Sequence, residues 1–223
     1  MELNIIDPVE SLIRHDGAIA VVIRHWLPEI AATNLHDTLT THLPWEQRLT
    51  YGAPVPRLIC AVGNGTLSEY KYNRMALPMN SWDTENEVFA AVRNLRDRIA
   101  DDSRIIEIVQ EELHYDSCLL NHYRNGRDSI DFHSDREALG PMNAVVALSL
   151  GATRTFHFKH KVKGPNEEFP HYSPNQYPRI KVPIHNGDLM IMAGRCQELW
   201  THGVPKEECE GSRISATFRL IGH

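Results

Sequence analysis

The feature that most constrains the fold is a series of short apolar segments in the second half of the chain. After about residue 104, these segments alternate with turn signals such as Asn125-Gly126, Gly164-Pro165 and Asn186-Gly187. Short segments with such turns are typical of β-sandwiches and jelly rolls. We therefore expect strands at residues 105–109, 117–123, 143–150, 154–160, 180–184, 188–193 and 213–220.

The first half of the chain shows helical periodicity instead. An apolar, β-branched run at residues 18–24 predicts one early strand. Pro28 suits the first turn of a helix. The apolar face expected for that helix consists of Ile30, Ala31, Leu35 and Leu39.

A second helix is expected to end near Ala100. Thr84 and Glu87 have the spacing of a capping box at its start. Its apolar face is predicted from Val88, Val92, Leu95 and Ile99. The stretch 43–80, rich in Pro, Gly and Asn, predicts turns and short strands, so helices come early and a β-core late, as in an α+β protein.

Composition limits the classes of protein that this chain can represent. Its 223 residues suit one domain, and a net charge of −6 argues against a broadly cationic nucleic-acid coat, although it leaves room for a local basic groove. The apolar runs are too short for a membrane span, so no membrane partner is expected. The four cysteines form no C-x-x-C pair, and no secretory signal is visible at the start. We expect a soluble, intracellular monomer, in the cytoplasm or nucleus.

The sharpest local motif is Asp131-Phe132-His133-Ser134-Asp135. In a strand, residues two apart point to the same face, so His133 and Asp135 can offer an imidazole and a carboxylate to one ion. His202 is the best candidate for a third ligand. Two His and one carboxylate suit non-haem Fe(II), which needs open positions for a co-substrate and O2. In a chain with 13 histidines an H-x-D match alone is weak.

A second constellation stands near the C-terminus. Alternation along residues 213–219 places Arg213, Ser215, Thr217 and Arg219 on one face. Two arginines facing into a β-core are costly unless they bind an anion, and the guanidinium fork matches a carboxylate. A solvent-facing edge strand with two ordinary surface arginines is an equally good interpretation of this segment alone.

Several motifs in one order resemble the AlkB family of Fe(II)- and 2-oxoglutarate-dependent dioxygenases. The resemblance is nearly continuous over residues 118–221, with a weaker match from Pro56-Arg57 to Trp82. The motifs are Asn121-x-Tyr123, Asp128-x-Ile130-x-x-His133-x-Asp135-x-Glu137, Ser149-Leu150-Gly151-Ala152-x-Arg154-x-Phe156, Gly187-Asp188-Leu189-x-x-Met192, Trp200-x-His202-x-x-Pro205 and Arg213-x-x-x-Thr217-Phe218-Arg219.

The resemblance implies the fold and the ligands. It implies a double-stranded β-helix (jelly-roll) core at residues 105–223 and N-terminal helices with a nucleotide-recognition lid at 1–104, together forming one structural unit. The residues that match the Fe(II) ligands are His133, Asp135 and His202. Those that match the 2-oxoglutarate site are Asn121, Tyr123, Arg213, Ser215, Thr217 and Arg219, and O2 is the remaining reactant.

The resemblance also implies residues that contact the substrate base. Tyr72 matches the aromatic that stacks on a flipped base, and Glu137 matches an acid that reaches the base edge. A base taken out of its stack needs a π-surface, which supports the first role. Tyr72 as a plain core aromatic, and Asn121 and Tyr123 as ordinary strand residues, remain alternatives.

Two positions depart from the family pattern. Ser215 stands where the family usually has Asn, so one contact to the co-substrate is expected to be shorter or water-mediated. Arg136 stands where some relatives have an acid, which leaves the base preference open.

Two features concern the surface that would meet nucleic acid. Residues 45–52 lie where relatives place a duplex-probing hairpin, although Tyr51 is expected to be a packed loop aromatic. A basic patch, or alternatively a solvated hairpin, is expected from Arg154, Lys159, His160, Lys161, Lys163, Arg179 and Lys181, beside a long surface loop at 161–179.

The function implied is oxidative demethylation of N-alkylated bases in DNA or RNA, with release of formaldehyde, succinate and CO2. A 2-oxoglutarate oxygenase that acts on protein or undamaged RNA would have the same core. A non-catalytic nucleic-acid binding module with a decayed metal site is a third interpretation, against which the complete ligand set counts.

Overall fold

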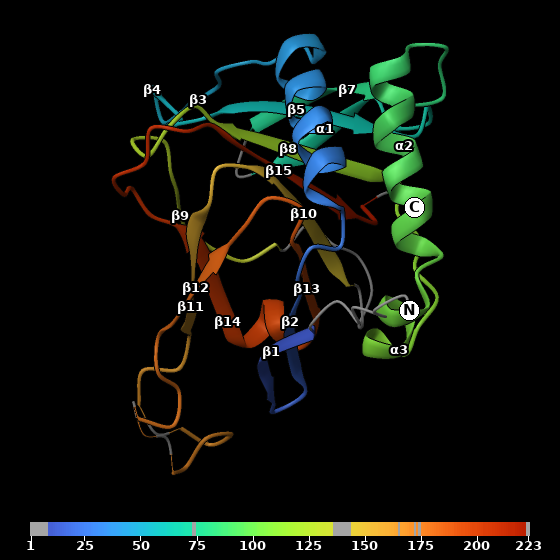
Figure 1. The fold of residues 1–223 in the computed structure, drawn as a ribbon. Helices are drawn as coiled ribbons and strands as arrows, with labels where there is room; N and C mark the ends of the chain where they lie inside the picture. Colours follow the sequence, from blue (N-terminus) through green and yellow to red (C-terminus); the bar gives the residue numbers. More distant parts are fainter. Residues whose placement is uncertain are drawn as a thin grey trace.

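Two β-sheets face each other, and helices cover the outer side of the larger sheet (Figure 1). The computed structural model describes residues 9–72, 75–135, 144–164, 166–171, 173 and 175–221. Within these ranges the larger sheet has nine strands and the smaller has four.

The larger sheet has the order β1-β2-β13-β10-β15-β8-β5-β7-β6. Its strands are β1 (Val9–His15), β2 (Ala18–Ile23), β5 (Leu58–Gly63), β6 (Glu69–Tyr72), β7 (Met75–Ser81), β8 (Ser117–Tyr123), β10 (Val145–Gly151), β13 (Leu189–Gly194) and β15 (Arg213–Arg219). The smaller sheet has the order β12-β11-β14-β9. Its strands are β9 (Ile130–His133), β11 (Arg154–His160), β12 (Ile180–Ile184) and β14 (Trp200–Val204). A short hairpin joins β3 (Leu49–Thr50) and β4 (Ala53–Pro54).

The strands β8, β15, β10 and β13 face β9, β14, β11 and β12 and form the expected jelly roll. Their pairing is antiparallel throughout. Along β10, Val145 and Ala147 pack toward the smaller sheet, whereas Val146 and Leu148 pack toward the helices. Burying each large apolar side chain contributes about 1.5–3 kcal/mol, so the two layers together stabilise the larger sheet from both sides.

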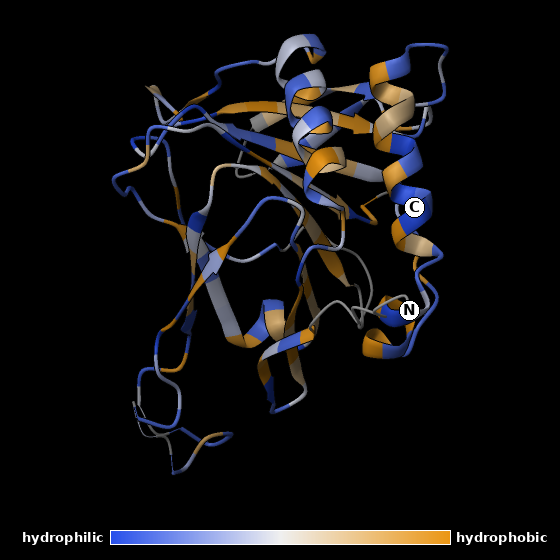
Figure 2. Ribbon diagram, in the orientation of Figure 1, coloured by the Kyte–Doolittle hydropathy of each residue, from blue (hydrophilic) through white to orange (hydrophobic). Residues whose placement is uncertain are grey.

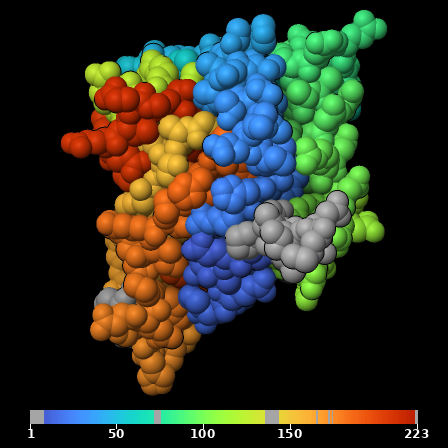
Figure 3. Space-filling view, viewed as in Figure 1, coloured from blue at the N-terminus to red at the C-terminus, as the bar shows by residue number. Residues whose placement is uncertain are grey.

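Helices α1 (Glu29–His42) and α2 (Glu87–Ala100) lie side by side on the outer face of the larger sheet (Figure 3). The face of α1 differs from the prediction. Ala32 and Leu39 are its buried residues, whereas Ile30 is 78% exposed and Ala31 is also exposed. Pro28 fixes the start of the helix, and the phase that buries Leu39 turns Ile30 to the surface.

The start of α2 also differs from the prediction. Asn86 is the N-cap, and its Oδ1 accepts a hydrogen bond from the backbone N–H of Val88 at 3.0 Å. Thr84 lies two residues before the N-cap and accepts from the N–H of Asn86 instead. The predicted capping box of Thr84 and Glu87 is therefore wrong, while the apolar face of Val88, Val92, Leu95 and Ile99 is confirmed.

The predicted strand at residues 105–109 is wrong, because this segment belongs to α3 (Ser103–Val109). Asp102 is the N-cap, and its carboxylate accepts a hydrogen bond from the N–H of Arg104 at 3.0 Å. Ile105, Ile108 and Val109 are buried, which is a helical spacing. An apolar run this short fits the periodicity of a strand as well as that of a helix, and the N-cap at Asp102 favours the helix.

Several strands were not predicted by range, namely β1, β9 and β14. Each is short or polar on one face, and β9 has two exposed residues among its four. Short strands β5 to β7 come from the stretch expected to form turns and short strands, and β5 pairs with β8. The division of the chain at residue 104 stays a prediction.

The long loop between β11 and β12 is held against the protein by two of its aromatic side chains. Hydrophobic residues concentrate on the strands, whereas this loop is mostly hydrophilic and projects from the smaller sheet (Figure 2). Within its described residues, Phe169 and Tyr177 pack against His160, and the Tyr177 hydroxyl donates to Asp16 at 2.7 Å. None of the helices described in this structure has the length and apolar character needed to cross a membrane.

Asp102 is expected to contribute more to the stability of the fold than an ordinary surface acid does. It caps α3 and also accepts a hydrogen bond from Trp26 Nε1 at 2.7 Å. We expect Asp102→Ala to lower the free energy of unfolding by about 2 kcal/mol, as measured by urea denaturation. The exposed neighbour serves as the control, and Asp101→Ala is expected to change stability by less than about 0.5 kcal/mol. Equal stability of the two variants would contradict the capping role.

Candidate metal centre and co-substrate pocket

The pairing of the edge strand β9 with its neighbour β14 brings two histidines together. His133 ends β9 and His202 lies in the middle of β14, and the antiparallel register places the two residues directly opposite each other. Their ring centroids are 4.4 Å apart. Residues opposite each other in an antiparallel pair have side chains on the same face, so both rings point into the space between the sheets.

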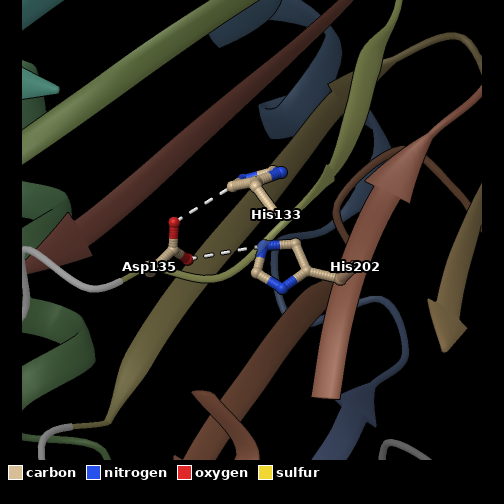
Figure 4. Close-up of side chains that lie close together, drawn as sticks. All are labelled: His133, Asp135 and His202. Carbon is tan, nitrogen blue, oxygen red and sulfur yellow. Dashed lines mark ion pairs between the residues drawn. The ribbon is translucent and has the colours of Figure 1, made fainter. Parts of the chain in front are cut away.

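Asp135 completes a three-residue cluster (Figure 4). It lies two residues beyond the end of β9, and its backbone N–H donates to Gln197 Oε1 at 2.8 Å. His133 Nε2 lies 3.7 Å from Asp135 Oδ1, and His202 Nε2 lies 3.5 Å from Asp135 Oδ2. The candidate ligand atoms are all within 4.8 Å of one another.

Both histidines are held in the neutral form that binds metals. Burial lowers the pKa of His133, and burial together with the nearby His133 lowers the pKa of His202 to about 3. His133 Nδ1 lies 2.8 Å from the carbonyl oxygen of Asp131. A proton on Nδ1 donates to that carbonyl and leaves the Nε2 lone pair free for a metal.

A buried arginine keeps Asp135 ionised. Burial, the largest influence, raises the pKa of Asp135, but the charge and the hydrogen bond of Arg219 act in the opposite direction, and the net shift is downward. Arg219 donates from Nη2 to Asp135 Oδ1 at 2.6 Å. Arg219 is held in turn by a hydrogen bond to the Tyr70 hydroxyl, from β6.

Arg213 is a buried cation with unused donors. Its side chain is 2% exposed, and Nη2 donates to Ser149 Oγ at 2.7 Å. Among the described residues, Nε and Nη1 of Arg213 have no hydrogen-bond partner. The guanidinium stacks on the ring of Tyr123, its cross-strand neighbour, with Cζ 5.3 Å from the centroid. A buried guanidinium with free donors calls for an anion.

The residues predicted to bind the metal and the co-substrate surround one cavity between the sheets. It is lined by His133, Asp135, His202, Asn121, Tyr123, Arg213, Ser215, Thr217 and Arg219. Ser215 pairs with Asn121, as Arg213 pairs with Tyr123, so the two strands β15 and β8 present one polar face. The edge-strand interpretation of residues 213–219 is wrong, because β15 lies between β10 and β8.

This donor set fits Fe(II) and a dicarboxylate co-substrate. Two neutral imidazoles and one carboxylate form the combination that non-haem Fe(II) enzymes use, with positions left for further ligands. Asp135 Oδ2 has no hydrogen-bond partner among the described residues and faces His202, as a metal ligand would. The free donors of Arg213 suit the carboxylate of a co-substrate at the other end of the cavity.

Two residues that support the site were missed from the sequence. Arg57 is buried and donates from Nε to Asn121 Oδ1 at 2.6 Å. Gln197 lies in the short helix α4 (Cys196–Leu199) and fixes the backbone of Asp135. Arg57 stands in the weakly matching Pro56-Arg57 motif, which is a usable signal, whereas nothing in the local sequence marks Gln197.

The predicted basic patch is only partly correct. Arg154 is buried and donates to Glu207 Oε1 at 2.7 Å, and His160 is buried against Tyr177 and Trp200. Lys161 donates to the carbonyl of Gln197. The exposed cations that remain are Lys159 on β11, Lys181 on β12, and Lys163 and Arg179 in the loop between these strands.

The expectation that Tyr51 packs in a loop is wrong. Tyr51 is 79% exposed at the tip of the β3–β4 hairpin, where it and Gly52 both have positive φ values, 52° and 79°. Such a pair of φ values is typical of a tight two-residue hairpin turn. Arg136 and Glu137 lie outside the described residues, and Tyr72 is described only as the last backbone position of β6.

The fold and the three ligands define a non-haem iron oxygenase. The chain belongs to the 2OG-Fe(II) oxygenase superfamily, whose family model matches residues 19–219. Fe(II) and 2-oxoglutarate, expected from the sequence, are the cofactors by which that family is named.

The resemblance to AlkB proteins is confirmed by the relatives. The chain is 34% identical over 194 residues to alpha-ketoglutarate-dependent dioxygenase alkB homolog 3 of Homo sapiens, covering 83% of this chain and 60% of the relative. It is 28% identical over 222 residues to DNA oxidative demethylase ALKBH2 of Arabidopsis thaliana, covering 92% and 67%. The chain thus spans about three fifths of the length of its AlkB homologue 3 relatives.

Solved structures confirm the fold. OsALKBH1 matches with a TM-score of 0.53 at 18% identity, over 94% of this chain and 99% of the other. An oxidoreductase of the 2OG-Fe(II) oxygenase family from Burkholderia pseudomallei matches with a TM-score of 0.54 at 14% identity, over 94% and 88%. At these identities the structural similarity supports the jelly-roll fold alone.

The metal cluster generates a direct test. We expect His133→Ala, Asp135→Ala and His202→Ala each to lose stoichiometric Fe(II) binding and turnover, because an open three-ligand site has no spare protein ligand. Iron content after anaerobic loading and succinate release measure the two effects. His114, which is exposed and outside the cluster, provides the control His114→Ala. Near-normal iron content in two of the three variants would disprove the ligand assignment.

Proposed function

We propose that this chain is an oxidative demethylase of N-alkylated bases in nucleic acid. The observation that carries the proposal is the single cavity that joins the iron-ligand cluster to a buried Arg213 with free donors. Relatives named as a DNA oxidative demethylase and as alpha-ketoglutarate-dependent dioxygenases support the same chemistry.

The overall reaction balances without any further reductant. One 2-oxoglutarate and one O2 are consumed, 2-oxoglutarate loses CO2 to give succinate, and the second oxygen atom enters a C–H bond of the N-methyl group. The resulting hemiaminal releases formaldehyde and restores the base. Bound Fe(II) supplies the O2 activation, and the protein supplies ligands, orientation and a dry cavity.

The chain's own residues would bind and orient the co-substrate. Arg213 holds the distal carboxylate with the two donors that are free in this structure, and Ser149 and Tyr123 fix its guanidinium. In this proposal Asn121, held by Arg57, and Arg219, held by Asp135 and Tyr70, contact the end of the co-substrate that binds the metal. Ser215 and Thr217 line the wall between the two ends.

The substrate base would enter through a groove beside His133. The groove has a volume of about 280 Å³ and is lined by residues of the β3–β4 hairpin, by Arg57 and by β9. In this proposal Tyr72 stacks on the base, and Glu137 and Arg136 contact its edge. In this proposal Tyr51, which is exposed at the hairpin tip, probes the duplex.

The compartment, the oligomeric state and the partner of the protein form part of the proposal. We infer an intracellular monomer acting on alkylated DNA or RNA. Cys60, Cys118 and Cys196 are buried free thiols, which suits a reducing compartment. A 2-oxoglutarate oxygenase of protein or of undamaged RNA remains the second candidate, because the iron core would be the same.

Arg213 gives the sharpest test of the co-substrate site. We expect Arg213→Lys to raise the KM for 2-oxoglutarate about ten- to a hundred-fold, because an ammonium cannot form the bidentate pair. Steady-state succinate release at varied 2-oxoglutarate measures it. Arg14→Lys, on the exposed edge of β1, is the matched control. An unchanged KM in Arg213→Lys would assign this arginine a purely structural role.

A substrate panel tests the function itself. We expect 2-oxoglutarate-dependent formaldehyde release with N-methylated oligonucleotides, and at least ten-fold less with the unmethylated sequences or with methylated peptides. Single- and double-stranded DNA and RNA should be compared at equal concentration. Turnover on peptide or unmethylated RNA alone would favour the second candidate instead.

The same assay separates base binding from iron chemistry. Tyr72→Ala is expected to weaken use of the methylated oligonucleotide about ten-fold, since a stacking contact is worth about 1–3 kcal/mol. Tyr72→Phe, which keeps the ring, is its matched control. Equal loss of oligonucleotide-independent succinate release in Tyr72→Ala would show that Tyr72 supports the core rather than the base.

A further inference from the structure

An exposed aromatic side chain lies next to an iron ligand on the outer surface of the smaller sheet. Phe132 precedes His133 in β9, so alternation turns it away from the metal cluster, and it is 39% exposed. The guanidinium of Arg179 lies over the Phe132 ring, with Cζ 5.3 Å from the centroid. The ring of His157, from β11, is 6.3 Å away. We call Phe132, His157 and Arg179 the outer strip.

A glycine makes the outer strip continuous. β14 runs between β9 and β11, and its residue opposite His157 is Gly203. A Cβ at Gly203 would lie 2.9 Å from the carbonyl oxygen of Ile130 and 3.2 Å from the backbone nitrogen of Phe132. No side chain fits at that point, so Phe132 reaches His157 across a bare section of β14. The sheet therefore presents two neighbouring rings, Phe132 and His157, tilted at 51° to each other, with no side chain of β14 between them.

The charge of the strip favours an anionic partner. Lys181 pairs with His157 across the β11–β12 ladder and is exposed, as are Lys159 and Arg179. Of the nearby acids, Glu207 is bound by Arg154 and Thr155, which leaves the exposed Asp131 beside the strip. Three exposed cations around an aromatic face stand out in a chain whose net charge is −6.

The strip adjoins the entrance to the site. Phe132 and His133 both line the groove that runs between β9 and the β3–β4 hairpin. A polymer that places one residue in that groove must carry its next residue over the rim, and Phe132 forms that rim. A small molecule bound in the cavity does not extend to the outer strip.

We propose that the outer strip binds the nucleotide next to the flipped base. Its base stacks on the exposed part of Phe132, and its phosphates contact Arg179 and Lys181. This inference rests on the proposed function and deepens it, because it predicts a substrate of at least two nucleotides with a single-stranded flank. Stacking on an aromatic ring backed by arginine, with phosphate contacts alongside, is the usual physics of single-strand binding.

Binding, measured without turnover, tests the proposal. Fluorescence anisotropy would follow a labelled single-stranded pentanucleotide with one N-methylated base at its centre. We expect Phe132→Ala to raise its Kd about ten-fold, because one base stack is lost. Phe132→Tyr keeps the ring and is expected to stay within about two-fold of the unchanged protein.

The cationic part is tested by salt. We expect Arg179→Ala to weaken binding and to reduce the slope of log Kd against log salt concentration by about 0.7, as for one lost phosphate contact on a single strand. Arg14→Ala, on β1 of the other sheet, removes the same charge and is expected to keep both Kd and slope.

The outcomes separate this inference from the function on which it rests. Unchanged protein that binds no pentanucleotide overturns the proposed function. Unchanged protein that binds, with Phe132→Ala of normal Tm binding equally well, overturns the outer strip alone. If Phe132→Ala has a lowered Tm, the test rests on the exposed Arg179. An unchanged slope of log Kd against log salt concentration in Arg179→Ala then overturns the proposed role of the outer strip. Poly-glutamate binding that depends on Phe132 would instead make the strip a site for acidic peptides.

Discussion

The ion pair between Asp135 and Arg219 is the interaction on which the site depends. It joins the segment after β9 to β15, a central strand of the larger sheet, with 2.6 Å between Oδ1 and Nη2, and Tyr70 binds the same arginine from β6. Both charges are buried, and breaking such a pair from one side costs about 3–5 kcal/mol. The pair keeps a carboxylate ionised in an apolar core and orients its second oxygen toward His202.

Alternation along the strands lets one sheet serve two purposes. Ile214, Ala216 and Phe218 of β15 pack under the helices, while the residues between them line the polar cavity. The side chains on the helical side bury apolar surface, whereas the inner face carries arginines and hydroxyls and buries little of it. A polar face on β15 is therefore tolerated, because Arg219 has an acid as its partner and Arg213 keeps donors for an incoming carboxylate.

The ligands were predictable because local rules govern them. The alternation from Arg213 to Arg219 needs only the geometry of a strand. His133 ends β9, and the H-x-D spacing keeps Asp135 near it although Asp135 lies two residues beyond the strand. The failures arise where tertiary packing decides: the cap at Asp102 makes a helix of residues 103–109, and the partner Glu207 buries Arg154. Gln197 acts on Asp135 across 62 positions of sequence, and no local pattern carries that contact.

The ladder between β5 and β8 determines which parts of the molecule can move. It extends from Leu58 opposite His122 to Gly63 opposite Ser117. Strand β6, which bears Tyr70, therefore belongs to the same hydrogen-bonded sheet as the cavity wall. Closing over a substrate as a hinged body would break that ladder. Adjustment is left to the β3–β4 hairpin and the rim of β9, whose backbone is not bound into the larger sheet. Specificity can then change by altering these edges while the iron ligands stay in place.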